Sequence, residues 1–157
     1  MIKIGDKMPE GVFGVMGSEG PTELSSGELF SGKKVVLFAV PGAFTPTCSA
    51  AHLPGFVVNY DQLIAKGVDT VACISVNDVF VMNAWGSSAN AENLVMLADG
   101  NGTYTGALGL EMDASGFGMG VRSKRFAMII DDSRLELLNI DEGAFESSSA
   151  EAVLAAL

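Results

Sequence analysis

The chain has 157 residues, of which 48% are hydrophobic and 18% are charged. This composition supplies a buried core and excludes a wholly disordered chain, and the length favours one domain over 1–157. The formal net charge of -10 repels nucleic-acid phosphates and anionic membrane surfaces. Neither a signal peptide nor a spanning apolar run is visible, so we expect a cytoplasmic protein with no nucleic-acid and no membrane partner.

The first half of the chain predicts a β-α-β order. Residues 34–40 and 69–76 are continuous apolar runs rich in β-branched residues, which is typical of strands buried on both faces. Between them, residues 57–66 have helical spacing. A further helix over 79–89 and a short strand over 94–98 repeat the order, so two parallel crossovers are predicted.

The second half of the chain adds a short helix from Thr103 and an irregular loop through Gly120. Residues 125–131 and 135–140 then predict an antiparallel hairpin, and 148–157 form an amphipathic helix. This order indicates a thioredoxin-like α/β fold in which helices flank a central mixed sheet. A small flavodoxin-like sheet also fits the pattern.

One segment carries the features of a reactive site. Residues 41–48 leave the first buried strand and open a helix, at the sheet edge where α/β proteins bind ligands. Pro46 suits the first helical position, which makes Thr45 the expected N-cap and places Cys48 in the first turn. Unpaired amide groups and the helix dipole favour a thiolate there, so Cys48 is predicted to be an activated nucleophile.

The remaining cysteine, histidine and arginine side chains indicate which reactions this site could carry out. Cys73 lies inside an apolar strand and is expected to be inert core packing. Two cysteines and one histidine are too few for a structural zinc site, and the absence of a Cys-x-x-Cys pair excludes internal dithiol exchange. His52 follows Cys48 by one helical turn and is expected to be a local hydrogen-bonding residue more than a general base. Arg125 begins an apolar strand and is a candidate to hold a thiolate and a polar oxygen substrate.

Residues 41–49 (Pro-Gly-Ala-Phe-Thr-Pro-Thr-Cys-Ser), followed by His-Leu-Pro-Gly at 52–55, resemble the active-site signature of the type II, or peroxiredoxin-5-like, peroxiredoxins. Blocks at 75–82 and 122–127 resemble that subgroup in the same order. The resemblance implies a thioredoxin-like fold with an N-terminal extension. It also implies the reduction of hydrogen peroxide and organic hydroperoxides by thiol chemistry, with no metal and no cofactor.

The resemblance assigns roles to four residues. Cys48 is the peroxidatic cysteine, whose thiolate attacks a peroxide oxygen and becomes a sulfenic acid. Thr45 hydrogen-bonds the sulfur and the substrate oxygen, Arg125 stabilises the thiolate and orients the peroxide, and Pro41 shields the site from water. Further candidates for the substrate pocket are Gly42, Phe44, Thr47, His52 and Phe117.

The chain departs from the family pattern near its C-terminus. Residues 143–149 contain serines where some relatives carry a resolving cysteine. We therefore expect an external thiol (glutathione with glutaredoxin, or thioredoxin) to recycle Cys48, with resolution by Cys73 after local unfolding as the alternative. The resemblance also implies a homodimer. A peroxide sensor that passes oxidation from Cys48 to partner proteins remains a rival hypothesis, and a chaperone-like role is a third.

Overall fold

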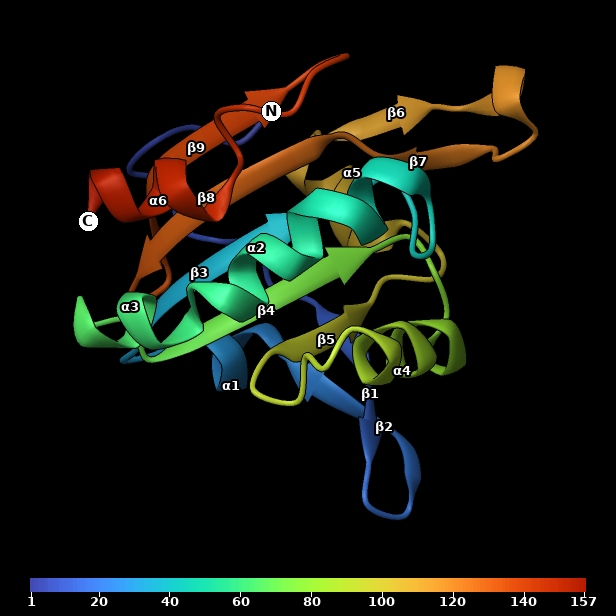
Figure 1. Ribbon diagram of the computed structural model, residues 1–157. Coiled ribbons are helices and arrows are strands. Elements are labelled where there is room, and N and C mark those ends of the chain that lie inside the picture. Colours follow the sequence, from blue (N-terminus) through green and yellow to red (C-terminus); the bar gives the residue numbers. More distant parts are fainter.

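The computed structural model describes residues 1–157 (Figure 1). The strands are β1 (Val12–Gly17), β2 (Gly20–Ser25), β3 (Lys34–Ala39), β4 (Thr70–Ser75), β5 (Val95–Ala98), β6 (Glu111–Asp113), β7 (Val121–Ser123), β8 (Arg125–Asp131) and β9 (Arg134–Asp141). The α-helices are α1 (Ser26–Phe30), α2 (Leu53–Val58), α3 (Tyr60–Ala65), α4 (Val79–Ser88), α5 (Thr103–Leu108) and α6 (Ala150–Ala156). A π-helical turn covers Cys48–His52, and a 3-10 turn covers Ser115–Phe117.

Seven strands form one mixed sheet in the order β2-β1-β5-β4-β3-β8-β9. β3, β4 and β5 run parallel, whereas β8 pairs antiparallel with β3 and β9 pairs antiparallel with β8. This arrangement confirms the predicted thioredoxin-like α/β architecture with its two parallel crossovers. The flavodoxin-like alternative is wrong, because the strand next to β3 at the 125–131 position is antiparallel.

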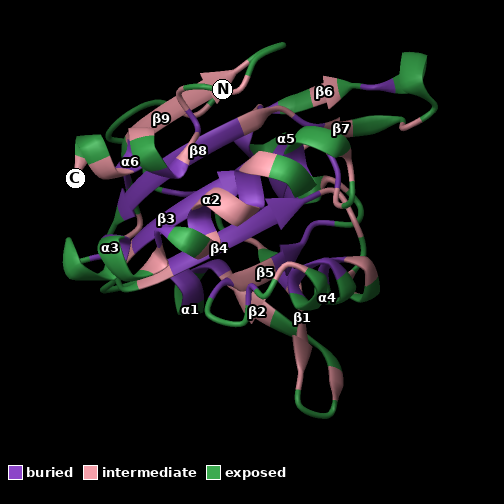
Figure 2. Ribbon diagram, in the orientation of Figure 1, coloured by how far each residue is buried: buried purple, intermediate pink, exposed green.

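The central strands are buried on both faces (Figure 2), as their continuous apolar sequences predict. Successive side chains of β3 alternate, so Val36 and Phe38 enter one core while Val35 and Leu37 enter the other. The first core packs under α2, α3, α4 and α6, and the second is covered by α1, α5 and the segment around Met8. The result is a three-layered domain with helices on both faces of the sheet.

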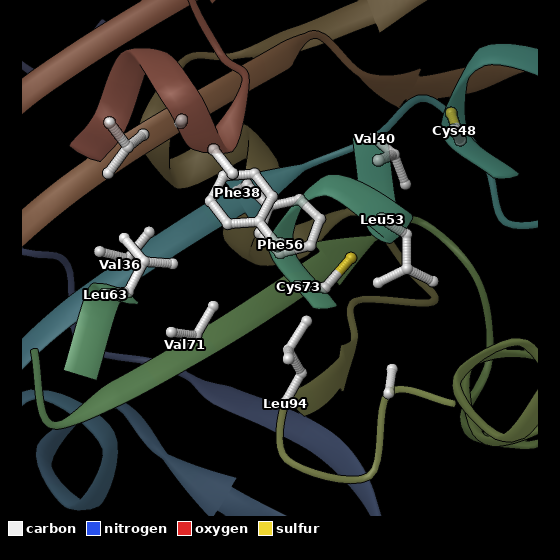
Figure 3. Close-up of a cluster of buried hydrophobic side chains, with 14 of the residues drawn as sticks. Val36, Phe38, Val40, Cys48, Leu53, Phe56, Leu63, Val71, Cys73 and Leu94 are labelled. Atoms are coloured by element: carbon white, nitrogen blue, oxygen red, sulfur yellow. The ribbon is translucent and has the colours of Figure 1, made fainter. Parts of the chain in front are cut away.

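An aromatic stack fixes α2 on the sheet. The rings of Phe38 in β3 and Phe56 in α2 have centroids 4.0 Å apart and planes inclined by 7° (Figure 3). Both side chains are fully buried, and such pairs stabilise a core beyond their buried area, by about 1 kcal/mol. Because α2 continues directly from the turn that contains Cys48, this stack also positions the cysteine.

The helix predicted over 57–66 is two helices. α2 ends at Val58 and α3 begins at Tyr60, with Asn59 between them at φ -93° and ψ 7°. The Nδ2 of Asn59 donates a 2.8 Å hydrogen bond to the carbonyl of Gly55. The backbone N–H of Asn59 donates to the same carbonyl at 3.1 Å, so side chain and backbone share one acceptor where the two helices meet.

Two pairs of strands lie where no strand was expected. β1 and β2 form an antiparallel hairpin at the sheet edge, and their largely half-exposed residues give no continuous apolar run. β6 and β7 pair where we expected an irregular loop, and three residues are too few to show an alternating pattern. The β1–β2 hairpin corresponds to the N-terminal extension that the family resemblance implies, in which no strands were predicted.

The hairpin predicted from residues 125–140 is confirmed. Asp132 and Ser133 connect β8 to β9 with φ of 46° and 69°, and two left-handed central residues suit the tight turn that joins twisted strands. At the open end of this hairpin, Arg125 pairs with Asp141 in the strand register. This end of β8 and β9 borders the loop that contains Cys48.

Candidate active site

The loop after β3 is tightly built. A Cβ on Gly42 would lie 3.2 Å from Cε of Met119 and 3.2 Å from Cγ2 of Thr45, so a larger residue would require these side chains to shift by a few tenths of an ångström. Phe44 adopts φ 62°, a left-handed conformation that costs a non-glycine residue ~1 kcal/mol. The chain therefore turns sharply between the strand and the helix that follows it.

Side chains from the end of β4 hold this loop. Oγ of Ser75 lies 2.6 Å from Oδ1 of Asn77 and 3.3 Å from the carbonyl oxygen of Val40. Oδ1 of Asn77 also accepts a 3.0 Å hydrogen bond from the backbone N–H of Ala43. The sequence of this block indicates no role beyond the family resemblance, but the structure shows that it holds the loop before Cys48 in place.

Cys48 is the third helical residue after the start at Pro46, as predicted. Its side chain is fully buried. Thr45 precedes the helix but does not cap it with its side chain, because its hydroxyl instead donates a 2.7 Å hydrogen bond to the carbonyl of Gly42. The hydroxyl is thereby oriented by the loop, and its oxygen lone pairs remain able to accept.

Arg125 reaches this helix from the first position of β8. Its Nη2 donates a 3.1 Å hydrogen bond to Sγ of Cys48, and its Nη1 lies 2.8 Å from Nδ1 of His52. The ring of Phe145 packs with its centroid 5.8 Å from Cζ of the same guanidinium, within cation–π range. Three neighbours therefore orient the guanidinium, and the structure brings Arg125 and Cys48 together as the sequence analysis expected.

His52 is buried behind the arginine. Its Nε2 lies 3.0 Å from the carbonyl oxygen of Ser148, and its ring packs 5.0 Å from that of Phe38. Burial and the positive charge of Arg125 lower the pKa of His52 to about 3, so the ring is neutral at physiological pH. His52 does form hydrogen bonds, but the expectation that they are local is wrong, because its partners Arg125 and Ser148 lie 73 and 96 residues away in the chain.

A pocket of about 590 Å³ opens beside the arginine. Pro41, Thr47 and Phe145 line it, together with Arg125 itself. The pocket gives a small molecule a route from solvent toward the guanidinium that contacts the sulfur.

Five further residues were expected to line the substrate pocket, and four of them do not line it. Thr47 lines the pocket, whereas Gly42 is buried in the loop and His52 lies behind Arg125. Phe44 and Phe117 are 55% and 85% exposed, and neither lines this pocket. Phe117 projects from the 3-10 turn between β6 and β7, a hairpin that the sequence pattern did not reveal.

Cys73 lies in the middle of β4 and is fully buried in the same hydrophobic cluster as Cys48 (Figure 3). Burial raises the pKa of the Cys73 thiol well above its ordinary value, and the neighbouring charge of Cys48 acts in the same direction. The thiol therefore stays protonated at neutral pH and is a poor nucleophile. Its predicted burial in the core is confirmed.

Comparisons with known proteins agree with this geometry. The family model described as Redoxin matches residues 3–154. Peroxiredoxin-2C of Oryza sativa subsp. japonica is 50% identical over 159 residues, which span 99% of this chain and 98% of the rice protein. Reduced Prx3 from Vibrio vulnificus, in a crystal structure with hydrogen peroxide, is 57% identical with a TM-score of 0.96 and covers 99% of each chain. Peroxiredoxin 5 from Alvinella pompejana is 35% identical with a TM-score of 0.87, covering 99% of this chain and 97% of that one.

The domain is thioredoxin-like and holds a buried cysteine that is hydrogen-bonded to an arginine. Because the family model matches nearly the whole length of the chain, the chain belongs to the redoxin family. Its relatives place it among the type II peroxiredoxins, and it is a thiol-dependent peroxidase. None of its helices has the length and apolar character that crossing a membrane requires.

Proposed function

We propose that Cys48 is the peroxidatic residue and reduces hydrogen peroxide and organic hydroperoxides. The thiolate sulfur attacks one peroxide oxygen, a sulfur–oxygen bond forms, and the oxygen–oxygen bond breaks. Cys48 is oxidised to the sulfenic acid, while the departing oxygen leaves as an alkoxide or hydroxide and takes up a proton. The contact of 3.1 Å between Nη2 of Arg125 and Sγ of Cys48 is the observation that carries this proposal.

The surrounding groups support the same step. The guanidinium of Arg125 is a fixed donor that stabilises negative charge on the sulfur and on the departing oxygen, which is electrostatic preorganisation. The hydroxyl of Thr45 is held by Gly42 at the start of the helix and is the second polar group for the substrate. Pro41 lines the pocket and limits the access of water to the sulfur.

An external thiol completes the proposed cycle. The thiol sulfur attacks the sulfenic acid, water leaves, and a mixed disulfide forms. A second thiol then reduces this disulfide and regenerates Cys48. Because Cys73 is buried and protonated, we favour glutathione with glutaredoxin, or thioredoxin, as the reductant. A reduced Cys48 at the start of each cycle favours a reducing compartment such as the cytoplasm.

Peroxide consumption with each candidate reductant tests this proposal. We would compare wild type and Cys48→Ser with hydrogen peroxide and with cumene hydroperoxide, in the presence of glutathione alone, glutathione with glutaredoxin, or thioredoxin. Sustained turnover by wild type and none by Cys48→Ser is the expected result. Turnover that survives Cys48→Ser would overturn the assignment, and stable mixed disulfides with particular proteins in place of turnover would favour the peroxide sensor.

We also propose that two chains pair as a homodimer. Phe44, Phe80 and Phe117 are 55%, 65% and 85% exposed, so three aromatic rings are in contact with water in the single chain. A second copy that covers them would remove this apolar surface from water. Sedimentation equilibrium should give twice the chain mass for wild type, and a reduced dimer fraction for Phe80→Glu and Phe117→Glu. A monomeric wild type at micromolar concentration would contradict the dimer.

A further inference from the structure

The carboxylate of Asp141 organises the loop that follows β9. It accepts hydrogen bonds from the backbone N–H groups of Glu146, Ser147 and Ser148 at 3.0, 3.1 and 2.8 Å. The hydroxyls of Ser147 and Ser148 add two further hydrogen bonds at 2.7 and 2.6 Å. Five donors thus converge on one side chain and fold the loop back toward β8.

These hydrogen bonds keep Asp141 charged. Although partial burial alone raises the pKa of its carboxyl, the hydrogen bonds from Ser148 and Ser147 outweigh it and lower the pKa well below its usual range. Asp141 also pairs with Arg125 in the β8–β9 register, so the folded loop begins directly opposite the arginine that contacts Cys48.

The folded loop presents a backbone oxygen to His52. The carbonyl of Ser148 lies 3.0 Å from Nε2, whereas Nη1 of Arg125 lies 2.8 Å from Nδ1. A carbonyl oxygen can only accept, and a guanidinium can only donate. A neutral ring satisfies both neighbours only when its proton is on Nε2 and the lone pair of Nδ1 faces the arginine.

The loop acts on the same site through a second contact. The ring of Phe145 lies 4.9 Å from that of His52 and 5.8 Å from Cζ of Arg125. A loop released from Asp141 would therefore loosen the packing around the arginine as well as the hydrogen bond to the histidine. Ser147 and Ser148, which belong to the serine-containing stretch 143–149, are among the residues that close the loop.

We propose that Asp141 is a positioning residue for peroxide reduction: it folds the C-terminal loop so that the Ser148 carbonyl holds His52 in its Nε2–H form, and Nδ1 then aims Arg125 at Cys48. This inference rests on the proposed role of Cys48 and Arg125. It extends that role to a side chain that does not touch the sulfur, the histidine or the substrate.

Nitrogen NMR of the histidine ring tests the tautomer directly. His52 is the only histidine, so selective ¹⁵N-histidine labelling gives signals from one ring without assignment. Wild type should show a protonated Nε2 and a bare Nδ1 at neutral pH. A protonated Nδ1, or a doubly protonated ring, would overturn the proposal whatever the variants do.

Asp141→Asn tests the coupling to catalysis, and Glu146→Gln is its matched control. Asp141→Asn removes a negative charge at the end of β9 and Glu146→Gln removes one from the loop that follows, but the Glu146 side chain is exposed and makes no hydrogen bond in the structure. Asp141→Asn should populate the second tautomer and slow sulfenic acid formation at Cys48 about tenfold, as expected for disturbing one hydrogen bond to a charged group. Glu146→Gln should leave both the tautomer and the rate unchanged.

Three results separate the possible failures. If folded Asp141→Asn keeps the wild-type tautomer and rate, Asp141 is not a positioning residue. If its rate falls while the tautomer stays unchanged, the loop acts by another route and the proposed coupling is wrong. If wild type forms no sulfenic acid at Cys48, the proposed function fails, and this is seen by mass before any variant is compared.

Discussion

Nη2 of Arg125 donates a hydrogen bond of 3.1 Å to Sγ of Cys48, across 77 residues of chain. The antiparallel pairing of β8 with β3 produces this contact, because it places the first residue of β8 beside the loop that leaves β3. A guanidinium fixed against a buried sulfur stabilises the thiolate without reorganising during the reaction. The chemistry proposed for Cys48 therefore depends on the sheet that brings these two residues together.

Removal of this donor should slow the reaction with peroxide. Arg125→Ala is expected to lower the rate of sulfenic acid formation about 100- to 1,000-fold, the usual effect of deleting one donor from a preorganised site. Arg134→Ala, which changes an exposed arginine at the start of β9, is the control and should behave as wild type. Equal rates for wild type and Arg125→Ala would remove Arg125 from the mechanism.

The rate of the reaction with peroxide should depend on the hydroxyl of Thr45 more than on its methyl group. Thr45→Val retains the shape but loses the hydroxyl, and we expect a decrease of about 10- to 100-fold in the second-order rate constant with peroxide. Thr45→Ser retains the hydroxyl and should stay within a few-fold of wild type. Stopped-flow fluorescence of Trp85, which donates a 3.0 Å hydrogen bond to Oγ of Ser49 beside Cys48, provides a signal for the reaction. A Thr45→Val rate that matches Thr45→Ser would show that the hydroxyl plays no part.

The buried, neutral His52 predicts a specific pH dependence of stability. Its pKa is about 3 in the folded chain and 6.5 in a solvated one, so the unfolded state binds the extra proton between these values. The free energy of unfolding should therefore decrease as the pH falls below 6.5, by up to about 1.4 kcal/mol per pH unit. Urea titrations between about pH 4.5 and 7 measure this slope, because a histidine in the unfolded chain titrates within this range.

The comparison variant for this slope is His52→Leu, which cannot bind a proton. Its stability should be lower throughout, because Arg125 and the Ser148 carbonyl lose their partner, but its pH dependence in the same window should be flatter. The carboxyl of Asp141 contributes only near the acidic end of this window, because the stability that its lowered pKa provides is lost between about pH 5 and pH 1. Parallel curves for wild type and His52→Leu would contradict a neutral, buried histidine.

Cys73 should react only when the domain opens. In Cys48→Ser the remaining thiol is buried in the middle of β4 and its pKa is raised, so iodoacetamide should modify it no faster than the chain unfolds. Alkylation in urea should be complete and fast. Rapid alkylation of native Cys48→Ser would show that Cys73 is accessible, and resolution of the sulfenic acid by this cysteine would then become the better hypothesis.

Much of this site could be predicted from local sequence. Pro46 and the turn before it place Cys48 at a helix start, and the apolar run that begins at Arg125 places that residue at the end of a strand. The burial of Cys73 likewise follows from its apolar neighbours. These features depend on residues close together in the chain, where periodicity and turn chemistry are informative.

The remaining features depend on contacts between distant residues. Nothing near His52 in the sequence indicates that the carbonyl of Ser148 faces it, because that contact requires the folded Asp141 loop. The clamp by Asn77 on the loop before Cys48 requires β4 to lie beside β3. Short strands such as β6 are set by backbone pairing instead of apolar pattern, so their three residues carry no signal.

Intact mass after a brief exposure to peroxide shows whether Cys48 forms a sulfenic acid. Fully reduced wild type, Cys48→Ser and Cys73→Ala would be mixed with equimolar hydrogen peroxide for a few seconds without added thiol. We predict a gain of one oxygen in wild type and Cys73→Ala, and no change in Cys48→Ser. A wild type that gains no oxygen would contradict the peroxidatic role of Cys48, and one that loses two hydrogens to form a disulfide with Cys73 would contradict recycling by an external thiol.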